Sequence, residues 1–267
     1  MQRFLSAATV TSVGLTCKAY LNCGLCSISV RGLPHLLDAL NSPERQSGQG
    51  IVTVSNHLST LDDPLVWGAL PARTYLRPHT TRWTLGASDI IFTNPVFSAF
   101  FRKGQVVETF RGAGVYQPAV DAAIEKLRSG AWLHLFAEGK VCQSHTYRAD
   151  PRTGVTRLQR FKWGIGRILM ETPRPPTIIP MWLTGFDDLM PEGRRSPWKY
   201  LPHPGVRLSV TFGAPIPPAA VHATLGEQEK KRVDVETRMA LTDLVQRAVE
   251  DLGRKVSGDL LIGPPRE

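Results

Sequence analysis

Short hydrophobic runs alternate with amphipathic segments along most of the chain. Several runs are rich in β-branched and aromatic residues, which favour strands. These predicted strands are residues 51–54, 83–87, 105–109, 132–136, 177–183 and 206–212. Other segments repeat apolar residues at spacings of three and four, which is typical of helices. These predicted helices are residues 118–128, 158–169 and 241–252. Strands that alternate with helices predict an α/β fold, with a mixed, mostly parallel sheet flanked by helices.

The N-terminal region has a different pattern. From Phe4 to Val30 only Lys18 is charged, and the uncharged runs on either side of it are 14 and 12 residues long. Each run is too short to span a bilayer. We therefore expect a helix, broken near Gly14 and Gly24, that lies in the interface of a membrane. The alternative is a helix that packs into the core of a soluble domain.

A polar, turn-rich stretch at residues 42–50 follows this region and predicts a loop. It divides the chain into a membrane-associating region, residues 1–41, and a main domain, residues 51–255. A second polar stretch, residues 143–156, predicts a surface insertion.

Length and charge narrow the choice of partners. The 267 residues suffice for one large domain, and the net charge of +9 indicates an anionic partner. Neither a zinc-ligand spacing nor a basic–aromatic stripe supports nucleic acid, so an anionic membrane surface is the better candidate. Cys23 and Cys26 have the spacing of half a metal site, but the sequence contains no second pair. We expect plain thiols and no bound metal.

A histidine and an aspartate lie five positions apart, directly after the first predicted strand. Asp63, before Pro64, has the pattern of a helix N-cap, which leaves Asp62 without that role. Through a tight turn, Asp62 can reach a ring nitrogen of His57. The carboxylate would then orient the imidazole, so that its other nitrogen takes a proton from a hydroxyl. The alternative is structural: a hydrogen-bonded histidine beside two helix caps.

Ordered motifs in the chain resemble those of the glycerolipid acyltransferase superfamily. The first is Asn56-His57, followed after four residues by Asp62-Asp63-Pro64. The others are Arg-Gly-Ala-Gly-Val-Tyr-Gln at 111–117, Phe-Ala-Glu-Gly-Lys-Val at 136–141, Arg-Phe-Lys-Trp-Gly-Ile-Gly-Arg at 160–167 and Pro-Met-Trp at 180–182. Within the superfamily they are most similar to the mitochondrial phospholipid–lysophospholipid transacylases. Ala113 and Ala137 replace an acid and a proline that the family usually carries, and neither change removes a proposed catalytic group.

The resemblance implies a role for each motif residue. His57 would be the general base and Asp62 its orienting partner. Arg111 would bind a phosphate, with Glu138 holding Arg111 or a substrate hydroxyl. The backbone N–H of Gly139 and the side chain of Lys140 would add phosphate contacts. Substrate contacts are also implied for Asn56 and for Pro180, the latter on an apolar strand that would line either an acyl groove or the core.

The implied activity is acyl transfer from a phospholipid to a lysophospholipid, without CoA or any other cofactor, in cardiolipin remodelling. The implied location is one leaflet of a mitochondrial membrane. The sequence contains no Gly-x-Ser-x-Gly motif of a serine hydrolase. Two alternatives stay open: an acyl-CoA-dependent lysophospholipid acyltransferase, and a catalytically silent lipid-binding protein. The oligomeric state stays open too.

Overall fold

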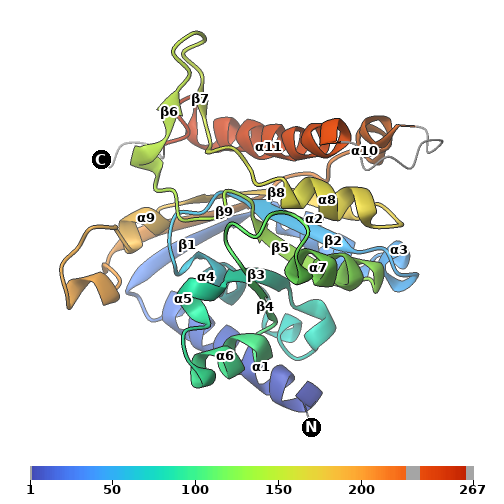
Figure 1. Ribbon diagram of the computed structural model, residues 1–267. Helices are drawn as coiled ribbons and strands as arrows, with labels where there is room; N and C mark the ends of the chain where they lie inside the picture. Colours follow the sequence, from blue (N-terminus) through green and yellow to red (C-terminus); the bar gives the residue numbers. More distant parts are fainter. Residues whose placement is uncertain (1, 227–234, 263–267) are drawn as a thin grey trace.

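The computed structural model describes residues 2–226 and 235–262. Its centre is a seven-stranded sheet with the order β1-β9-β8-β2-β5-β3-β4 (Figure 1). The strands are β1 (Cys26–Arg31), β2 (Ile51–Ser55), β3 (Trp83–Ala87), β4 (Val106–Thr109), β5 (Trp132–Phe136), β8 (Thr177–Thr184) and β9 (Val206–Phe212). Only the β8–β9 pair is antiparallel among the pairings of this sheet. The predicted mixed, mostly parallel sheet is therefore confirmed.

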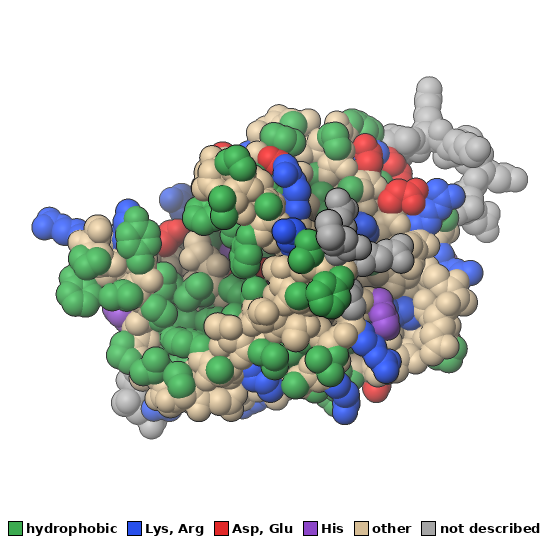
Figure 2. Space-filling view, turned by 90° about the horizontal axis from the view of Figure 1, so that it is seen from below, with side chains coloured by type: hydrophobic (Ala, Val, Ile, Leu, Met, Phe, Trp, Pro, Cys, Tyr) green, Lys and Arg blue, Asp and Glu red, His purple; other side chains and the backbone are tan. Residues whose placement is uncertain are grey.

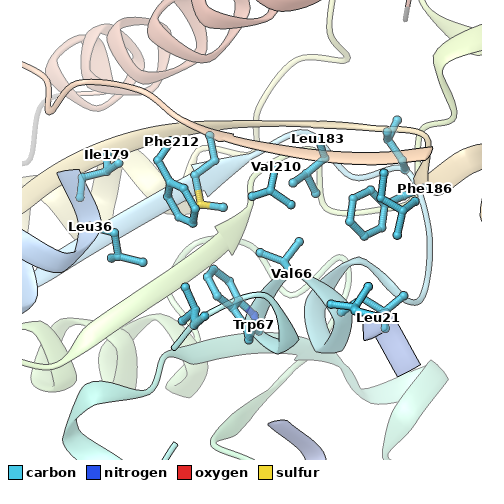
Figure 3. Packing of buried hydrophobic residues seen from close by; sticks show 14 of the residues in the cluster. Leu21, Leu36, Val66, Trp67, Ile179, Leu183, Phe186, Val210 and Phe212 are labelled. Atoms are coloured by element: carbon cyan, nitrogen blue, oxygen red, sulfur yellow. The ribbon is translucent and has the colours of Figure 1, made fainter. Parts of the chain in front are cut away.

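Helices cover both faces of the sheet and bury two hydrophobic clusters. On one face lie α1 (Gln2–Asn22), α2 (Leu33–Asn41) and α4 (Asp62–Gly68), packed on side chains such as Ile179 and Phe212 (Figure 3). On the other face lie α7 (Pro118–Arg128), α8 (Gly164–Glu171) and α11 (Val235–Ser257). The shorter helices are α3 (Pro43–Gln46), α5 (Ser88–Ile91), α6 (Pro95–Lys103), α9 (Phe186–Leu189) and α10 (Pro218–Leu225).

The structure corrects the prediction for the N-terminal region. Helix α1 runs unbroken through Gly14, where a side chain would collide with the Tyr75 ring at 2.8 Å. The helix ends before Gly24, as predicted. Residues 26–31 then form β1, which pairs in parallel with β9, so they belong to the main sheet. The alternation in Cys-Ser-Ile-Ser-Val-Arg is that of an edge strand with one face buried. Among the described helices, none combines the length and hydropathy that crossing a membrane requires.

Three further segments differ from or extend the predictions. The loop at residues 42–50 contains helix α3, capped by Ser42. The predicted helix at 158–169 begins only at Gly164, because the backbone N–H groups of Leu158 and Phe161 donate to side chains of α11. The insertion at 143–156 contains most of a protruding hairpin formed by β6 (Arg148–Ala149) and β7 (Thr156–Arg157) (Figure 1).

Candidate active site

The candidate site lies at the carboxyl edge of the parallel strands. Strands β2 and β5 are neighbours, with Ser55 opposite Phe136, and each ends in a turn that carries motif residues. His57 follows β2, and Glu138 follows β5. Open α/β sheets place their ligands at this edge, because successive loops leave the sheet there.

His57 and Asp62 make the predicted contact. The Nδ1 atom of His57 lies 2.9 Å from Oδ2 of Asp62, and the same oxygen accepts hydrogen bonds from the backbone N–H groups of Leu58 at 2.6 Å and Ser59 at 2.9 Å. The Asp62 side chain is fully buried, whereas that of His57 is 19% exposed. Burial raises the pKa of the Asp62 carboxyl, and these hydrogen bonds oppose the rise. Asp62 therefore holds both the ring and the turn.

The predicted N-cap role of Asp63 is wrong. Helix α4 begins at Asp62, and the carboxylate of Asp63 accepts a hydrogen bond from Nε1 of Trp67 at 2.9 Å. It also forms an ion pair with Arg82. Burial raises the pKa of Asp63, but the pair with Arg82 outweighs this and holds the pKa below its ordinary value. Asp63 therefore joins α4 to the start of β3.

The imidazole of His57 rests on an aromatic floor. Its ring stacks on Phe136 with centroids 4.1 Å apart, and Phe136 meets the edge of a second histidine, His134. His134 is fully buried in β5, and Thr53 Oγ1 lies 2.8 Å from its Nδ1 atom. Burial lowers the pKa of His134 to about 3, so this ring is neutral at physiological pH. His134 was not among the predicted site residues, although a histidine inside the apolar run Trp-Leu-His-Leu-Phe was a visible signal.

Glu138 holds His57, and the predicted contact between Glu138 and Arg111 is absent. Oε1 of the buried Glu138 accepts a hydrogen bond of 3.0 Å from the backbone N–H of His57. Burial raises the pKa of Glu138 to about 7, and the hydrogen bond from His57 lowers it. Arg111 instead lies 3.3 Å from Asp89, with both side chains about half exposed. Glu138 therefore contacts the main chain of His57, and the partner of Arg111 is Asp89.

The prediction for the Gly139 backbone is also wrong, because its N–H donates to the carbonyl of Phe136 at 3.0 Å. Gly139 has a φ of 74°, and a side chain there would lie 3.0 Å from the stem of Lys162. Lys162 thus lies against the motif turn, in which Lys140 is exposed. Lys162 was not among the predicted site residues, although it belongs to the 160–167 motif.

Asn56 and Pro180, for which substrate contacts were predicted, both contact other parts of the fold. The amide of Asn56 is fully buried and makes two hydrogen bonds with the backbone of Leu183, at 3.0 and 2.9 Å. It therefore joins the end of β2 to β8. Pro180 belongs to β8 and lies opposite Val54 of β2. Its ring lies close to Gly213, on the face of the sheet that α11 covers. His57, stacked on Phe136, lies on the other face, so the structure does not bring Pro180 to the histidine.

The arrangement suits proton transfer. Asp62 occupies Nδ1 of His57, and Nε2 has no hydrogen-bond partner among the residues that the structure describes. A ring held this way can accept a proton at Nε2, because the buried carboxylate stabilises the imidazolium. No group of three His, Cys, Asp or Glu side chains in the described residues could hold a metal ion.

Comparison with known proteins defines the class. Residues 36–184, more than half of the chain, match the family described as Acyltransferase. A solved structure, the 1-acyl-sn-glycerophosphate acyltransferase of Thermotoga maritima, superposes with a TM-score of 0.55 over 92% of this chain and 79% of that chain. At 21% identity, that likeness supports the fold alone. The chain belongs to the acyltransferase family, within the glycerolipid acyltransferase superfamily, and it is an acyltransferase.

Three relatives are more similar in sequence. Taffazin of Dictyostelium discoideum is 35% identical over 215 residues, which cover 79% of this chain and 69% of that protein. N-acylphosphatidylethanolamine synthase of Arabidopsis thaliana is 38% identical over 212 residues, or 78% of this chain and 69% of that protein. Tafazzin of Drosophila melanogaster is 38% identical over 210 residues, or 78% of this chain and 51% of that protein.

Proposed function

We propose that this acyltransferase moves an acyl chain from a phospholipid to a lysophospholipid without CoA, with His57 as the general base. The 2.9 Å contact between His57 Nδ1 and Asp62 Oδ2, at the carboxyl edge of the sheet, carries the proposal. The similarity to two tafazzins supports the substrate class. Cardiolipin and its lyso form are the proposed lipids.

The reaction needs one base and no covalent enzyme intermediate. Nε2 of His57 takes the proton from the hydroxyl of the lysophospholipid, and the oxygen attacks the ester carbonyl of the donor. The tetrahedral intermediate then expels the donor's alkoxide, which receives the proton back from Nε2. One ester forms as one breaks, so the reaction is reversible, and Asp62 stabilises the imidazolium in both directions.

The headgroup phosphate needs cations near this base. We assign that contact to Arg111 and Lys140, which are exposed at the same edge of the sheet. Glu138 takes a different role, since its carboxyl holds the main chain of His57. Asn56, Gly139 and Pro180 support the fold around the site without a free polar group directed at substrate.

The N-acylphosphatidylethanolamine synthase relative favours a second candidate. Its name indicates an amine as acyl acceptor, and the relative is as similar to this chain as the Drosophila tafazzin. The same base would then deprotonate an ammonium in place of a hydroxyl. Acyl-CoA as the donor is the remaining alternative.

The proposed location is one leaflet of a mitochondrial membrane, where donor and acceptor lipids lie side by side. The N-terminal region, residues 1–41, has a single charged residue, Lys18, between Phe4 and Val30, and this and the positive charge of the chain support monotopic binding to an anionic surface.

The decisive experiment follows labelled acyl chains in CoA-free buffer. Labelled phosphatidylcholine is mixed with either monolysocardiolipin or phosphatidylethanolamine, and the products are identified by mass spectrometry. Labelled cardiolipin supports the proposal, whereas a labelled N-acyl lipid supports the second candidate. Transfer that requires added acyl-CoA would assign the chain to the CoA-dependent class. Lipid binding with no transfer under any of these conditions would contradict both candidates.

The base assignment has its own test. His57→Ala should lower the transfer rate by about a hundredfold to ten-thousandfold, with folding and vesicle binding unchanged. His222→Ala, at an exposed histidine of α10, is the matched control and should keep full activity. A His57→Ala rate above about a tenth of the wild-type rate would contradict the assignment.

A further inference from the structure

Helix α6 directs its apolar side chains outward. Only Ser98 is buried in this helix, while Val96 is 75% exposed, Phe97 52% and Phe100 45%. A helix on the surface of a protein that is surrounded only by water turns its apolar side chains toward the core. The reversed pattern in α6 indicates that another apolar phase covers it.

The exposed face continues onto α1. Ser6 Oγ donates to the carbonyl of Lys103 at 2.8 Å and joins the two helices. Phe4 of α1 is 75% exposed and Leu15 is 45% exposed. An open cleft of about 480 Å³ lies between the helices, lined by Thr9, Pro95, Val96, Ala99, Phe100 and Lys103. We define the α1–α6 face as Phe4, Leu15, Val96, Phe97 and Phe100.

The surroundings of the α1–α6 face are basic. Helix α6 ends with Arg102, which pairs with Glu108 at 2.7 Å, and with Lys103, which lines the cleft; the sequence has no acidic residue before Asp38. Seen from below, hydrophobic side chains gather over one half of this side of the molecule, with Lys and Arg among them (Figure 2). Apolar groups flanked by cations match the interface of an anionic bilayer, where the apolar side chains enter the acyl region and the cations meet phosphates.

The same face lies close to the catalytic edge. Helix α1 packs on α4, with Lys18 Nζ donating to the carbonyl of Gly68 at its end, and both helices cover the side of the sheet on which His57 lies. At the carboxyl ends of β3 and β4, Ile90 and Phe110 are 53% and 49% exposed, and Arg111 lies 3.3 Å from Asp89 of α5. A bilayer on the α1–α6 face would therefore extend toward the turn that carries His57.

We propose that the α1–α6 face inserts into the interface of an anionic membrane and brings the His57 edge to the lipid surface. This inference rests on the proposed function, which takes both substrates from a membrane. It assigns the docking surface to the exposed side of α6 together with α1. The N-terminal segment alone does not form it, since residues 26–31 belong to the sheet. Deleting residues 1–30 would remove β1, so point variants on α6 are the sharper test.

The experiment measures flotation with vesicles of phosphatidylcholine, with or without phosphatidylglycerol. The triple variant V96D/F97D/F100D should reduce the fraction bound to anionic vesicles about tenfold or more. Leu260→Asp is the matched control, since Leu260 is 60% exposed and lies outside the face, and it should bind like the wild type. Circular dichroism checks folding, and Phe97→Asp alone is the milder variant if the triple variant unfolds.

Measurements of the transfer rate and of the mass of the protein in solution distinguish the possible outcomes. On dispersed dihexanoyl lipids the triple variant should match the wild type, whereas on vesicles its transfer rate should fall with binding. Unchanged vesicle binding would overturn the inference. Unchanged binding together with a change from dimer to monomer in light scattering would assign the face to a second copy of the chain. If the wild type transfers no acyl chain but its vesicle binding depends on the face, the proposed function fails and the docking surface stands.

Discussion

The backbone N–H of His57 donates a hydrogen bond of 3.0 Å to Oε1 of Glu138, 81 residues later in the sequence. The backbone carbonyl of His57 accepts a second bond, of 2.6 Å, from the N–H of Cys142. The segment that follows β5 therefore holds both backbone groups of the histidine. Asp62 holds the ring at Nδ1, so the direction of Nε2 is fixed by contacts from two neighbouring strand ends.

Stability should depend on the titration of Glu138. Burial raises the pKa of this carboxyl from 4.5 to about 7, so the folded protein binds its proton more tightly than the unfolded chain does. The contribution to the free energy of unfolding is full below about pH 4.5, falls as the pH rises, and is gone above about pH 7. Glu138→Gln cannot ionise, so above pH 7 it should be more stable than the wild type by up to about 3 kcal/mol.

Urea denaturation at several pH values between 4 and 8 tests this expectation. Glu125→Gln, at an exposed carboxylate of α7, is the control and should follow the wild-type curve. The difference between Glu138→Gln and the wild type should grow between pH 4.5 and 7. A constant difference across that range would show that Glu138 does not titrate there.

The order and type of the main strands could be predicted from the sequence. The runs at residues 83–87, 132–136 and 206–212 match β3, β5 and β9, because each is apolar, β-branched or aromatic and bounded by polar turns. Strand β1 could not be recognised, since it follows α1 in one uncharged stretch and its partner β9 lies about 180 residues later. The local sequence pattern predicts where a strand lies, whereas the strand with which it pairs is known only from the folded structure.

In the candidate site, too, contacts within one turn could be predicted and contacts between distant segments could not. The five-residue spacing sufficed for the contact between His57 and Asp62, because one turn forms it. The partners of Asn56 and Glu138 come from residues 127 and 81 positions away, and no local pattern points to them. For Arg111 the predicted partner was Glu138, whereas the structure places its guanidinium 3.3 Å from Asp89.

Two substitutions at Asp62 should separate its chemical role from its structural one. In Asp62→Asn the amide oxygen can still accept from the backbone of Leu58 and Ser59. The neutral amide, however, cannot stabilise the imidazolium of His57 as the carboxylate does. We expect kcat to fall about a hundredfold to ten-thousandfold, with stability nearly kept. Asp62→Ala should lose the same activity and also about 2–6 kcal/mol, since it leaves two buried N–H groups without an acceptor.

Transfer assays and urea denaturation of the two variants supply the measurement. Equal stability of Asp62→Ala and Asp62→Asn would contradict the turn-holding role. An Asp62→Asn variant with wild-type kcat would show that the reaction does not need a carboxylate to stabilise the imidazolium.

Acid should destabilise the protein through His134. Burial lowers the pKa of this ring from 6.5 to about 3, so the unfolded chain binds the proton more tightly than the folded protein does. Stability is therefore lost as the pH falls below about 6.5, by about 3 kcal/mol at pH 4. His134→Gln should remove this loss, and its free energy of unfolding relative to the wild type should rise on acidification. The control is His222→Ala, at an exposed histidine, which should leave the acid limb of the curve unchanged. A His134→Gln curve parallel to the wild type would assign the acid sensitivity to other groups.

Two glycines of the 160–167 motif make opposite demands on the space around them. A Cβ atom on Gly166 would lie 2.1 Å from the backbone carbonyl oxygen of Arg238 and 2.6 Å from Thr242 Oγ1, so α8 and α11 touch through this residue. A Cβ atom on Gly164, in the same helix, would find its nearest neighbour, Val120 Cγ2, at 3.9 Å. The closeness of α8 to α11 therefore depends on one of the two glycines.

Gly166→Ala should destabilise the protein by about 1–3 kcal/mol, because the backbone of α11 must move to admit the new methyl group. Gly164→Ala makes the same chemical change in open space and should be neutral or stabilising by up to about 1 kcal/mol, since alanine restricts the unfolded chain. Thermal or urea denaturation of both variants gives the comparison directly.

The loss at Gly166 should also weaken the attachment of the segment 158–163, in which the N–H groups of Leu158 and Phe161 bond to Glu250 and Gln246 of α11. Hydrogen exchange at Leu158 and Phe161 should accelerate in Gly166→Ala and stay unchanged in Gly164→Ala. Equal effects of the two substitutions would mean that helix propensity, and not the contact with α11, determines the role of these glycines.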